Sequence, residues 1–332
     1  MKRLFLSGLL LLMCFTLSVA GGRARNEALW TLRFGHVLSP ADIPHYHMEQ
    51  WARNVRDATN GMVNIEIFHS ARLGVEEDVL EQIRAGANMG WHTDFARLGT
   101  YIGPLSVPNA SFFVENLEEA MRLQYSPTLQ KYLEQLSSEF GFSVVSFLWS
   151  QAERHVFANR PARNPAEMAG LLIRSPPAPV WVESVNALGV TATPLAWGEI
   201  FTGIASGVVD GVEVGFMPGR NLRLYTITDY VMETGHIFLL NTLVVSSVWL
   251  DRLPVNYRRI VIDEANRSGL NSSRMHLQRG REALQELIEN GMTFIPREDL
   301  DIDAFRRASV QAYERLGLLE IRDAIHAEIG LR

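Results

Sequence analysis

The spacing of apolar and polar residues predicts alternating strands and helices in the first third of the chain. Apolar side chains recur at helical spacing over residues 46–59 and again over 75–85. Residues 63–68 alternate apolar and polar, which is typical of a strand with one buried face. Apolar runs at 32–38 and 87–93 predict two more strands. The resulting order, β-α-β-α-β, predicts a parallel α/β lobe.

Similar patterns continue to the C-terminus. They predict helices over residues 117–139, 165–169, 180–188, 197–206, 254–290, 301–316 and 318–329. They predict strands over 143–149, around Arg174, over 190–193 and within 230–247. Two segments, Ile83–Gly90 and Ile204–Gly211, each contain a helix end, a glycine stop and a short buried strand. We therefore expect them in corresponding places of two similar lobes.

The first twenty residues have the pattern of an export signal. A basic start at Lys2 and Arg3 precedes an apolar stretch, and small residues at 18–20 stand where signal peptidase cleaves. A membrane anchor is the alternative, but the apolar stretch is short for a spanning helix. We predict a cleaved signal peptide, residues 1–20, and a periplasmic location. The only cysteine, Cys14, would leave with the signal, so the mature chain would have no disulfide and no Cys nucleophile.

Composition narrows the remaining classes of function. With 332 residues, 47% of them hydrophobic, the chain can form roughly two domains. It carries 31 Lys and Arg against 37 Asp and Glu and has no basic run, so nucleic acid is not an expected partner. The sequence contains no nucleotide-binding glycine loop, no His-Glu-x-x-His and no Gly-x-Ser-x-Gly. We expect no cofactor and no metal.

Two arginines beside extended apolar runs, Arg154 and Arg174, are candidate ligand-binding residues. A guanidinium keeps its charge, and its planar fork pairs with a carboxylate through two hydrogen bonds. At the end of a buried strand, each arginine needs an anion, either an internal Asp or Glu or a bound ligand. Two such arginines beside one predicted lobe favour a ligand carboxylate.

The carboxyl ends of the first-lobe strands supply further candidates. Ligands of open α/β sheets bind at that edge, which places His36–Val37 and Thr93–Asp94 near the site. A structural role in the core remains an alternative for each histidine beside a predicted strand, namely His36, His92 and His236. The same alternative applies to the aromatic residues Trp91, Trp149, Trp197 and Phe216.

A set of short motifs runs through most of the chain. In order they are Thr59–Gly61, Ser70–Gly74, Ala152–Arg154, Gly170–Arg174, Ala192–Trp197, Gly207–Val214 and Thr234–His236. Together they resemble the solute-binding proteins of tripartite ATP-independent periplasmic (TRAP) transporters. The resemblance extends from about Leu32 to Leu316.

The resemblance implies a two-lobed α/β periplasmic binding protein of type II-like architecture, with hinge strands and a long helix spanning both lobes. Lobe I would begin with residues 29–150, and lobe II would comprise 151–238. Residues 239–332 would return with a strand of lobe I, the long helix and the C-terminal helices. The lobes would close around the ligand.

The resemblance also implies roles for individual residues. Arg174 would pair with the substrate carboxylate, Arg154 would be the second arginine at the same group, and Asp94 would be a pocket acid. Glu76 matches a polar position at a helix start, Trp197 an aromatic that lines the pocket, and Val37 a position that is polar in some members. Val214 departs from the family because it replaces a pocket asparagine. Neighbouring candidates are Glu213, Phe216, Trp149 and His36.

The function implied is capture of a small carboxylate-containing solute, such as a hydroxy acid or sugar acid, for delivery to the TRAP membrane subunits, by a protein expected to be a monomer. The alternative is an exported hydrolase or lyase, for example one using Asp94 and Glu213 as paired carboxylates. We expect Asp94 to compensate the charge of the two arginines, with Glu213 helping if it turns inward. A monocarboxylate with a polar end is therefore expected in preference to a long dicarboxylate.

Overall fold

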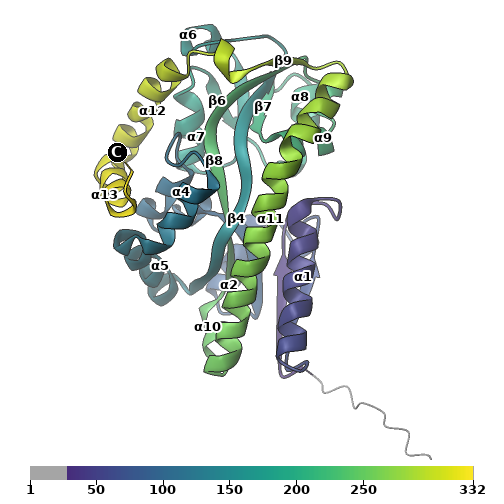
Figure 1. Cartoon of the computed structure of the whole chain (residues 1–332), viewed down its shortest axis with the longest axis vertical. Coiled ribbons are helices and arrows are strands. Elements are labelled where there is room, and N and C mark those ends of the chain that lie inside the picture. The colour runs from purple at the N-terminus through teal and green to yellow at the C-terminus, as the bar shows by residue number, and fades with distance from the viewer. Residues whose placement is uncertain (1–27, 332) are drawn as a thin grey trace, which may run out of the picture.

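The computed structural model describes residues 28–331. The expected signal peptide, residues 1–20, lies outside the described residues. Nine strands form one mixed sheet in the described part of the chain, in the order β2-β1-β3-β8-β4-β7-β5-β6, with β9 paired to β8. Each end of the sheet is a three-stranded parallel unit, and two long antiparallel strands join the units (Figure 1). The two-lobed α/β class is confirmed, whereas the lobe boundaries at 150 and 238 stay a prediction.

The first half of the molecule is the predicted β-α-β-α-β unit. It contains β1 (Trp30–Gly35), α1 (Ile43–Ala58), β2 (Val63–Phe68), α2 (Glu76–Arg84) and β3 (Met89–Asp94). Both β2 and β3 pair with β1 in parallel. The strand predicted from the alternating pattern over 63–68 and the helix predicted from helical spacing over 46–59 are therefore both confirmed.

The second half repeats this arrangement. Its strands are β5 (Leu172–Ser175), β6 (Thr191–Pro194) and β7 (Gly211–Val214), and β5 pairs in parallel with both others. Its helices are α6 (Pro165–Met168), α7 (Pro179–Asn186), α8 (Ile200–Ala205) and α9 (Phe216–Asn221), with 3-10 turns Trp197–Glu199 and Leu224–Thr226.

Two glycines mark equivalent places in the two halves. A Cβ added to Gly90 of β3 would lie 2.8 Å from the carbonyl oxygen of Val244, and one added to Gly211 of β7 would lie 2.0 Å from that of Phe157. Val244 pairs with Trp91, the residue after Gly90, and Phe157 pairs with Val212, the residue after Gly211. The carbonyl therefore has the same place in the register of both halves. The expected correspondence of Ile83–Gly90 with Ile204–Gly211 therefore holds in the topology.

The long strands and one helix connect the halves. These are β4 (Phe142–Ala158), β8 (Tyr230–Ser246) and α11 (Val255–Glu289), which Figure 1 shows extending along the molecule from one half to the other. The pairing of β4 with β8 shifts register between Ser150 and Glu153, where Ala152 has a φ of 60°. Such a bulge bends a strand locally, and it lies where the chain passes between the halves.

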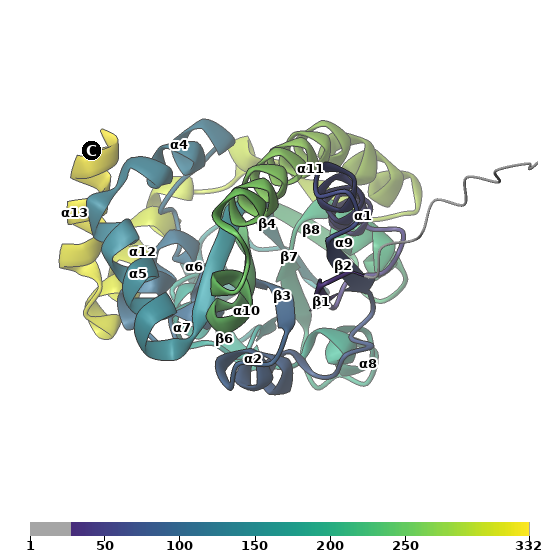
Figure 2. The ribbon, with the colours of Figure 1, turned by 90° about the horizontal axis from the view of Figure 1, so that it is seen from below.

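The long helix packs closely on β4. A Cβ on Gly269 of α11 would lie 2.6 Å from Nε1 of Trp149, so only glycine allows this approach. On the other side of α11, Trp51 of α1 donates a hydrogen bond to the carbonyl of Val261 at 3.0 Å. Figure 2 shows α1 and α11 side by side on the same face.

The prediction of one continuous helix over residues 117–139 is wrong. The structure divides it into α4 (Leu117–Arg122), the 3-10 turn Leu123–Tyr125 and α5 (Pro127–Phe140). Ser126 caps α5 by accepting a hydrogen bond from the amide of Leu129 at 3.1 Å, and Pro127 takes the first helical position. Proline is favoured there because it has no amide proton to lose, so the Ser-Pro pair begins a new helix.

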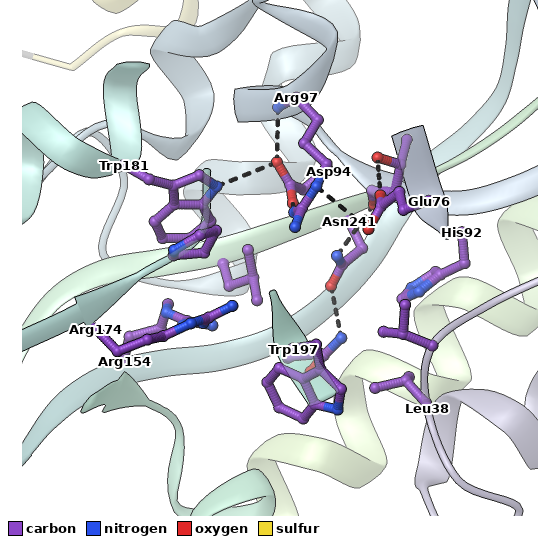
Figure 3. A pocket seen from close by; sticks show the side chains of 15 residues that line it. Leu38, Glu76, His92, Asp94, Arg97, Arg154, Arg174, Trp181, Trp197 and Asn241 are labelled. Atoms are coloured by element: carbon purple, nitrogen blue, oxygen red, sulfur yellow. Dashed lines mark hydrogen bonds and ion pairs between the residues drawn. The ribbon is translucent and has the colours of Figure 1, made fainter. Parts of the chain in front are cut away.

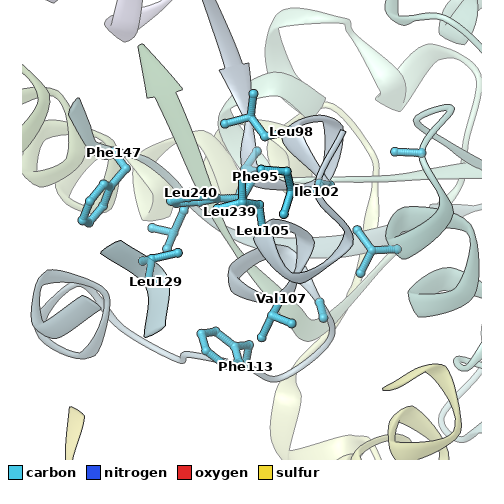
Figure 4. Packing of buried hydrophobic residues seen from close by; sticks show 14 of the residues in the cluster. Phe95, Leu98, Ile102, Leu105, Val107, Phe113, Leu129, Phe147, Leu239 and Leu240 are labelled. Atoms are coloured by element: carbon cyan, nitrogen blue, oxygen red, sulfur yellow. The ribbon is translucent and has the colours of Figure 1, made fainter. Parts of the chain in front are cut away.

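The remaining elements surround these layers. They are α3 (Phe95–Leu98), the 3-10 turns Gly103–Asn109 and Arg297–Asp299, α10 (Ser247–Asp251), β9 (Thr293–Ile295), α12 (Ile302–Leu316) and α13 (Leu319–Ile329). Figure 4 shows the apolar cluster formed around Phe95, Leu98, Ile102, Leu105, Val107, Phe113, Leu129, Phe147, Leu239 and Leu240. Over residues 28–331, no helix has the length and apolar character needed to cross a membrane.

Candidate functional site

A cavity lies where the two halves meet the long strands (Figure 3). Its walls come from the ends of β1, β3 and β5, from the bulged region of β4, from β8, and from α2 and α7. The lining residues are Val37, Leu38, Glu76, His92, Thr93, Asp94, Arg97, Gln151, Arg154, Arg174, Pro176, Trp181, Trp197, Leu239 and Asn241. The parallel strands place their carboxyl ends here, which is the edge where α/β sheets bind ligands.

Arg174 is the arginine without an acidic partner in this cavity. Its Nε donates to the carbonyl of Leu195 at 2.9 Å, while its enclosed Nη1 has no hydrogen-bond partner among residues 28–331. The residue is 1% exposed, and burial lowers the pKa of Arg174 to about 9. It is therefore still charged at neutral pH and holds an unused donor in a place that favours an anion.

The charge of Arg154 is neutralised by an acidic side chain of the protein itself. Its guanidinium pairs with the carboxylate of Glu213 through two nitrogens, one at 2.8 Å, and both side chains are almost fully buried. The indole ring of Trp181 lies over the guanidinium, 4.8 Å from its centre. Of the two partners considered for this arginine, the internal acid is the one found.

The first half contributes a network of ion pairs around Arg97, which the exposed Glu77 joins from outside the cavity at 3.9 Å. The guanidinium lies 2.5 Å from Asp94 and 3.2 Å from Glu76. Glu76 also accepts a hydrogen bond from the hydroxyl of Thr93 at 2.6 Å, and Asp94 accepts a long one of 3.4 Å from the indole of Trp181. Asp94 therefore forms no ion pair with Arg154 or Arg174. Burial has the largest effect on the pKa of Arg174 and lowers it, but the charge of Asp94 still acts on that guanidinium through space and raises its pKa.

Burial controls the protonation of Glu76. Removal from water raises the pKa of Glu76 to about 7, although Arg97 acts in the opposite direction. The network around the cavity contains three guanidiniums and the carboxyl groups of Asp94, Glu76 and Glu213. While Glu76 keeps its proton, one positive charge is left over, and Arg174 is the group without an acidic partner. A single bound carboxylate balances that charge.

A chain of amides holds the floor of the cavity. Asn241 donates from Nδ2 to the carbonyl of Thr93 at 3.0 Å, so its Oδ1 accepts from Nε2 of Gln151 at 2.9 Å. Because the Thr93 carbonyl can only accept, the orientation of both amides is determined. The carboxamide oxygen of Gln151 is not used in this chain.

His92 is an unexpected member of the site. It lies on β3 and is 4% exposed, and burial lowers the pKa of His92 to about 3, so the ring is neutral. Its enclosed Nε2 has no hydrogen-bond partner among the described residues. In Figure 3 it lies on the far side of the cavity from Arg174.

Six of the predicted site residues line this cavity: Val37, Glu76, Asp94, Arg154, Arg174 and Trp197. Two of the others lie in the second half, behind its wall. Val214 is fully buried in an apolar cluster, which explains why an apolar residue suits that position. Phe216 stacks on His155 at a centroid distance of 4.0 Å. Neither residue lines the cavity in this structure, and their contact with ligand stays a prediction.

The other three also lie outside the cavity wall. Glu213 is fully buried behind Arg154. Trp149 belongs to the core beneath α11. His36 is buried, and its Nε2 lies 3.1 Å from Nδ1 of His45. Among residues 28–331, no group of three or more His, Cys, Asp or Glu is arranged to hold a metal ion.

Sequence reasoning missed Arg97, Trp181, Gln151, Asn241 and His92 as lining residues. One signal for Arg97 existed, since it follows Asp94 by three positions, the spacing of neighbours on a helix. Trp181 had no comparable signal, because its two contacts, to Arg154 and Asp94, come from distant parts of the chain.

Residues 34–317 match the family model of bacterial extracellular solute-binding proteins, family 7. The chain belongs to this family. Its members are binding proteins of TRAP transport systems and not enzymes, so the alternative of a hydrolase or lyase is not supported.

Three similar proteins illustrate the family. A solute-binding protein of Chromohalobacter salexigens is 25% identical over 282 residues, 85% of this chain and 83% of its own. The apo open structure of a TRAP periplasmic solute-binding protein from Escherichia fergusonii is 30% identical, covers 90% of this chain and 99% of its own, and has a TM-score of 0.80. A further such structure, from Ochrobacterium anthropi with bound L-fuconate, is 23% identical, covers 90% and 99%, and has a TM-score of 0.84.

Proposed function

We propose that this solute-binding protein captures a hydroxylated monocarboxylate in the periplasm and delivers it, as a monomer, to the membrane subunits of a TRAP transporter. The free Nη1 of Arg174 is the observation that supports this assignment most directly. A carboxylate at that position would gain charge-assisted hydrogen bonds and balance the charge left over in the cavity. The L-fuconate bound by the Ochrobacterium anthropi relative belongs to the same chemical class.

The charges on the other side of the cavity favour one carboxylate over two. Asp94 and Glu76 lie in the first half, across the space from Arg174 (Figure 3). Their only guanidinium neighbour, among the described residues, is Arg97. A second carboxylate placed there would be repelled by the carboxylate of Asp94, whereas hydroxyl groups could donate to the oxygens of both acids.

The test is calorimetric titration of wild-type protein and the Arg174→Lys variant with L-galactonate, L-fuconate, D-glucuronate and succinate. Lysine keeps the charge but loses the planar fork. We expect the Lys variant to bind its best acid at least about 30-fold more weakly, equivalent to about 2 kcal/mol. Arg274→Lys, an exposed change on α11, is the control. Unchanged affinity in Arg174→Lys contradicts the clamp, and succinate as the best ligand contradicts the monocarboxylate class.

A further inference from the structure

We propose that His92 is a specificity-determining residue that forms a hydrogen bond with a hydroxyl group at the end of the ligand opposite its carboxylate. This inference rests on the proposed function, because Arg174 must hold the carboxylate end. It assigns a role in ligand selection to a residue that carries no charge.

The position of His92 supports the assignment. Arg174 comes from β5 in the second half, and His92 comes from β3 in the first half. Figure 3 shows them on opposite sides of the space that the lining side chains surround. A ligand whose carboxylate lies at Arg174 and whose chain crosses this space therefore presents its other end to His92.

The residue at the position equivalent to His92 in the second half has a fixed side-chain partner, which His92 lacks. Counting from Gly90 and Gly211, His92 of β3 corresponds to Glu213 of β7. Glu213 has a fixed partner, Arg154 of the adjacent long strand. The residue of β8 that corresponds to Arg154 is Asn241.

Asn241 uses both ends of its amide elsewhere. It donates to the Thr93 carbonyl and accepts from Gln151. His92 is therefore left with an enclosed Nε2 that has no partner among the described residues. A buried polar atom without a hydrogen bond raises the free energy of the protein. A ligand whose hydroxyl group supplies that hydrogen bond is therefore bound more tightly.

The neutral state of the ring decides which ligand group fits. A neutral imidazole has one donor and one acceptor nitrogen, and a hydroxyl group can satisfy either. It cannot balance a second carboxylate, and the nearby carboxylate of Asp94 repels one. The chemical class is thus a polyhydroxylated monocarboxylate.

A matched pair of probes isolates the proposed hydrogen bond. L-Fuconate is L-galactonate without its terminal hydroxyl group, so the pair differs only at the end opposite the carboxylate. We expect the wild type to bind L-galactonate about three- to tenfold more tightly, the range of one neutral hydrogen bond. In His92→Phe, which keeps a ring of similar size, that preference should disappear, and His92→Gln should restore part of it.

His47→Phe is the control. His47 lies on α1, is also buried, and also has an Nε2 without a partner among the described residues, but it does not line the cavity. This variant should keep the wild-type preference. Circular dichroism of the unliganded variants establishes that each is folded.

Each result has a defined meaning. If the wild type discriminates between the probes and His92→Phe discriminates equally well, the role of His92 is overturned. If the wild type binds both probes equally, or binds only D-glucuronate through Arg174, the inference fails while the proposed function stands. If the wild type binds none of the carboxylates tested, the proposed function fails as well.

Discussion

The two halves of the sheet share one topology and differ in how their charges are satisfied. In the second half, a buried ion pair joins β4 to β7, namely Arg154 with Glu213. In the first half, the corresponding positions are neutral, Asn241 and His92. The charges of the first half are gathered instead at Arg97, on the helix that follows β3.

This difference separates two tasks that one cavity must perform. The second half places one fixed positive charge, Arg174, beside an arginine that is already neutralised. The first half contributes the neutral side chains of His92 and Asn241 and the ion pairs around Arg97. In our proposal these neutral groups select among ligands through hydrogen bonds, and Asp94 disfavours a second negative charge. Repetition of a fold therefore supplied the two walls, and unequal side chains at equivalent positions gave them different chemistry.

The largest expected effect comes from breaking the charged pair. Arg154→Met leaves the fully buried carboxylate of Glu213 without its partner, and we expect the free energy of unfolding to fall by about 3–5 kcal/mol. The matched change in the first half, Asn241→Leu, should cost about 1–3 kcal/mol, because it strands only neutral groups. Urea unfolding without ligand at pH 7 measures both. Equal losses would show that the two halves do not differ in this respect.

The second effect is a pH dependence that belongs to the first half. The folded state raises the pKa of Glu76 from 4.5 to about 7, so between these values the folded protein holds a proton that the unfolded chain has lost. Stability from this group is therefore fully present below about pH 4.5, falls as pH rises, and levels off above about pH 7, a change of about 2–4 kcal/mol.

Comparison with Glu76→Gln isolates this contribution. Buried histidines with lowered pKa values, such as His92 and His236, act in the opposite sense, since they lose stability as pH falls. These terms are common to both proteins and cancel in the difference. Urea unfolding of wild type and variant at pH 5 and pH 8 should show the larger fall in the wild type. Parallel behaviour would contradict the raised pKa.

The smallest expected effect concerns the contact between the halves. Trp181→Phe removes the hydrogen bond to Asp94 and weakens the stacking over Arg154. Trp249→Phe is the control, because Trp249 is equally buried but its Nε1 has no partner among the described residues. We expect thermal unfolding to show an extra loss of about 1 kcal/mol for Trp181→Phe. The same loss in both variants would assign the effect to ring volume alone.

Much of the fold could be predicted because local pattern and final structure agree. The alternation in β2, the apolar periodicity of α1 and the glycine stops after α2 and α8 are all visible within the segments that they define. The break at Pro127 was also encoded locally, and the apolar periodicity on either side of it concealed the Ser-Pro signal.

The site was less accessible to such reasoning. All six residues of β3 are buried, so periodicity along the strand could not show that His92 lines the cavity while Trp91 belongs to the core. Arg154 was identified as a candidate, but its pairing with Glu213 depends on the antiparallel register of β4 and β7, two strands well separated along the chain. Which arginine stays free is a property of the assembled sheet.

The position of β8 has a consequence for how the molecule is assembled. This strand lies between β3 and β4 in the sheet, yet it follows both of them in the chain by many residues. While the chain is synthesised from its N-terminus, the edges of β3 and β4 that will pair with β8 stay open until residues 230–246 have been made. Open edges invite pairing with other chains. The two halves of the sheet are therefore joined late, and until then the edges of β3 and β4 add to the permanent edges at β2 and β6.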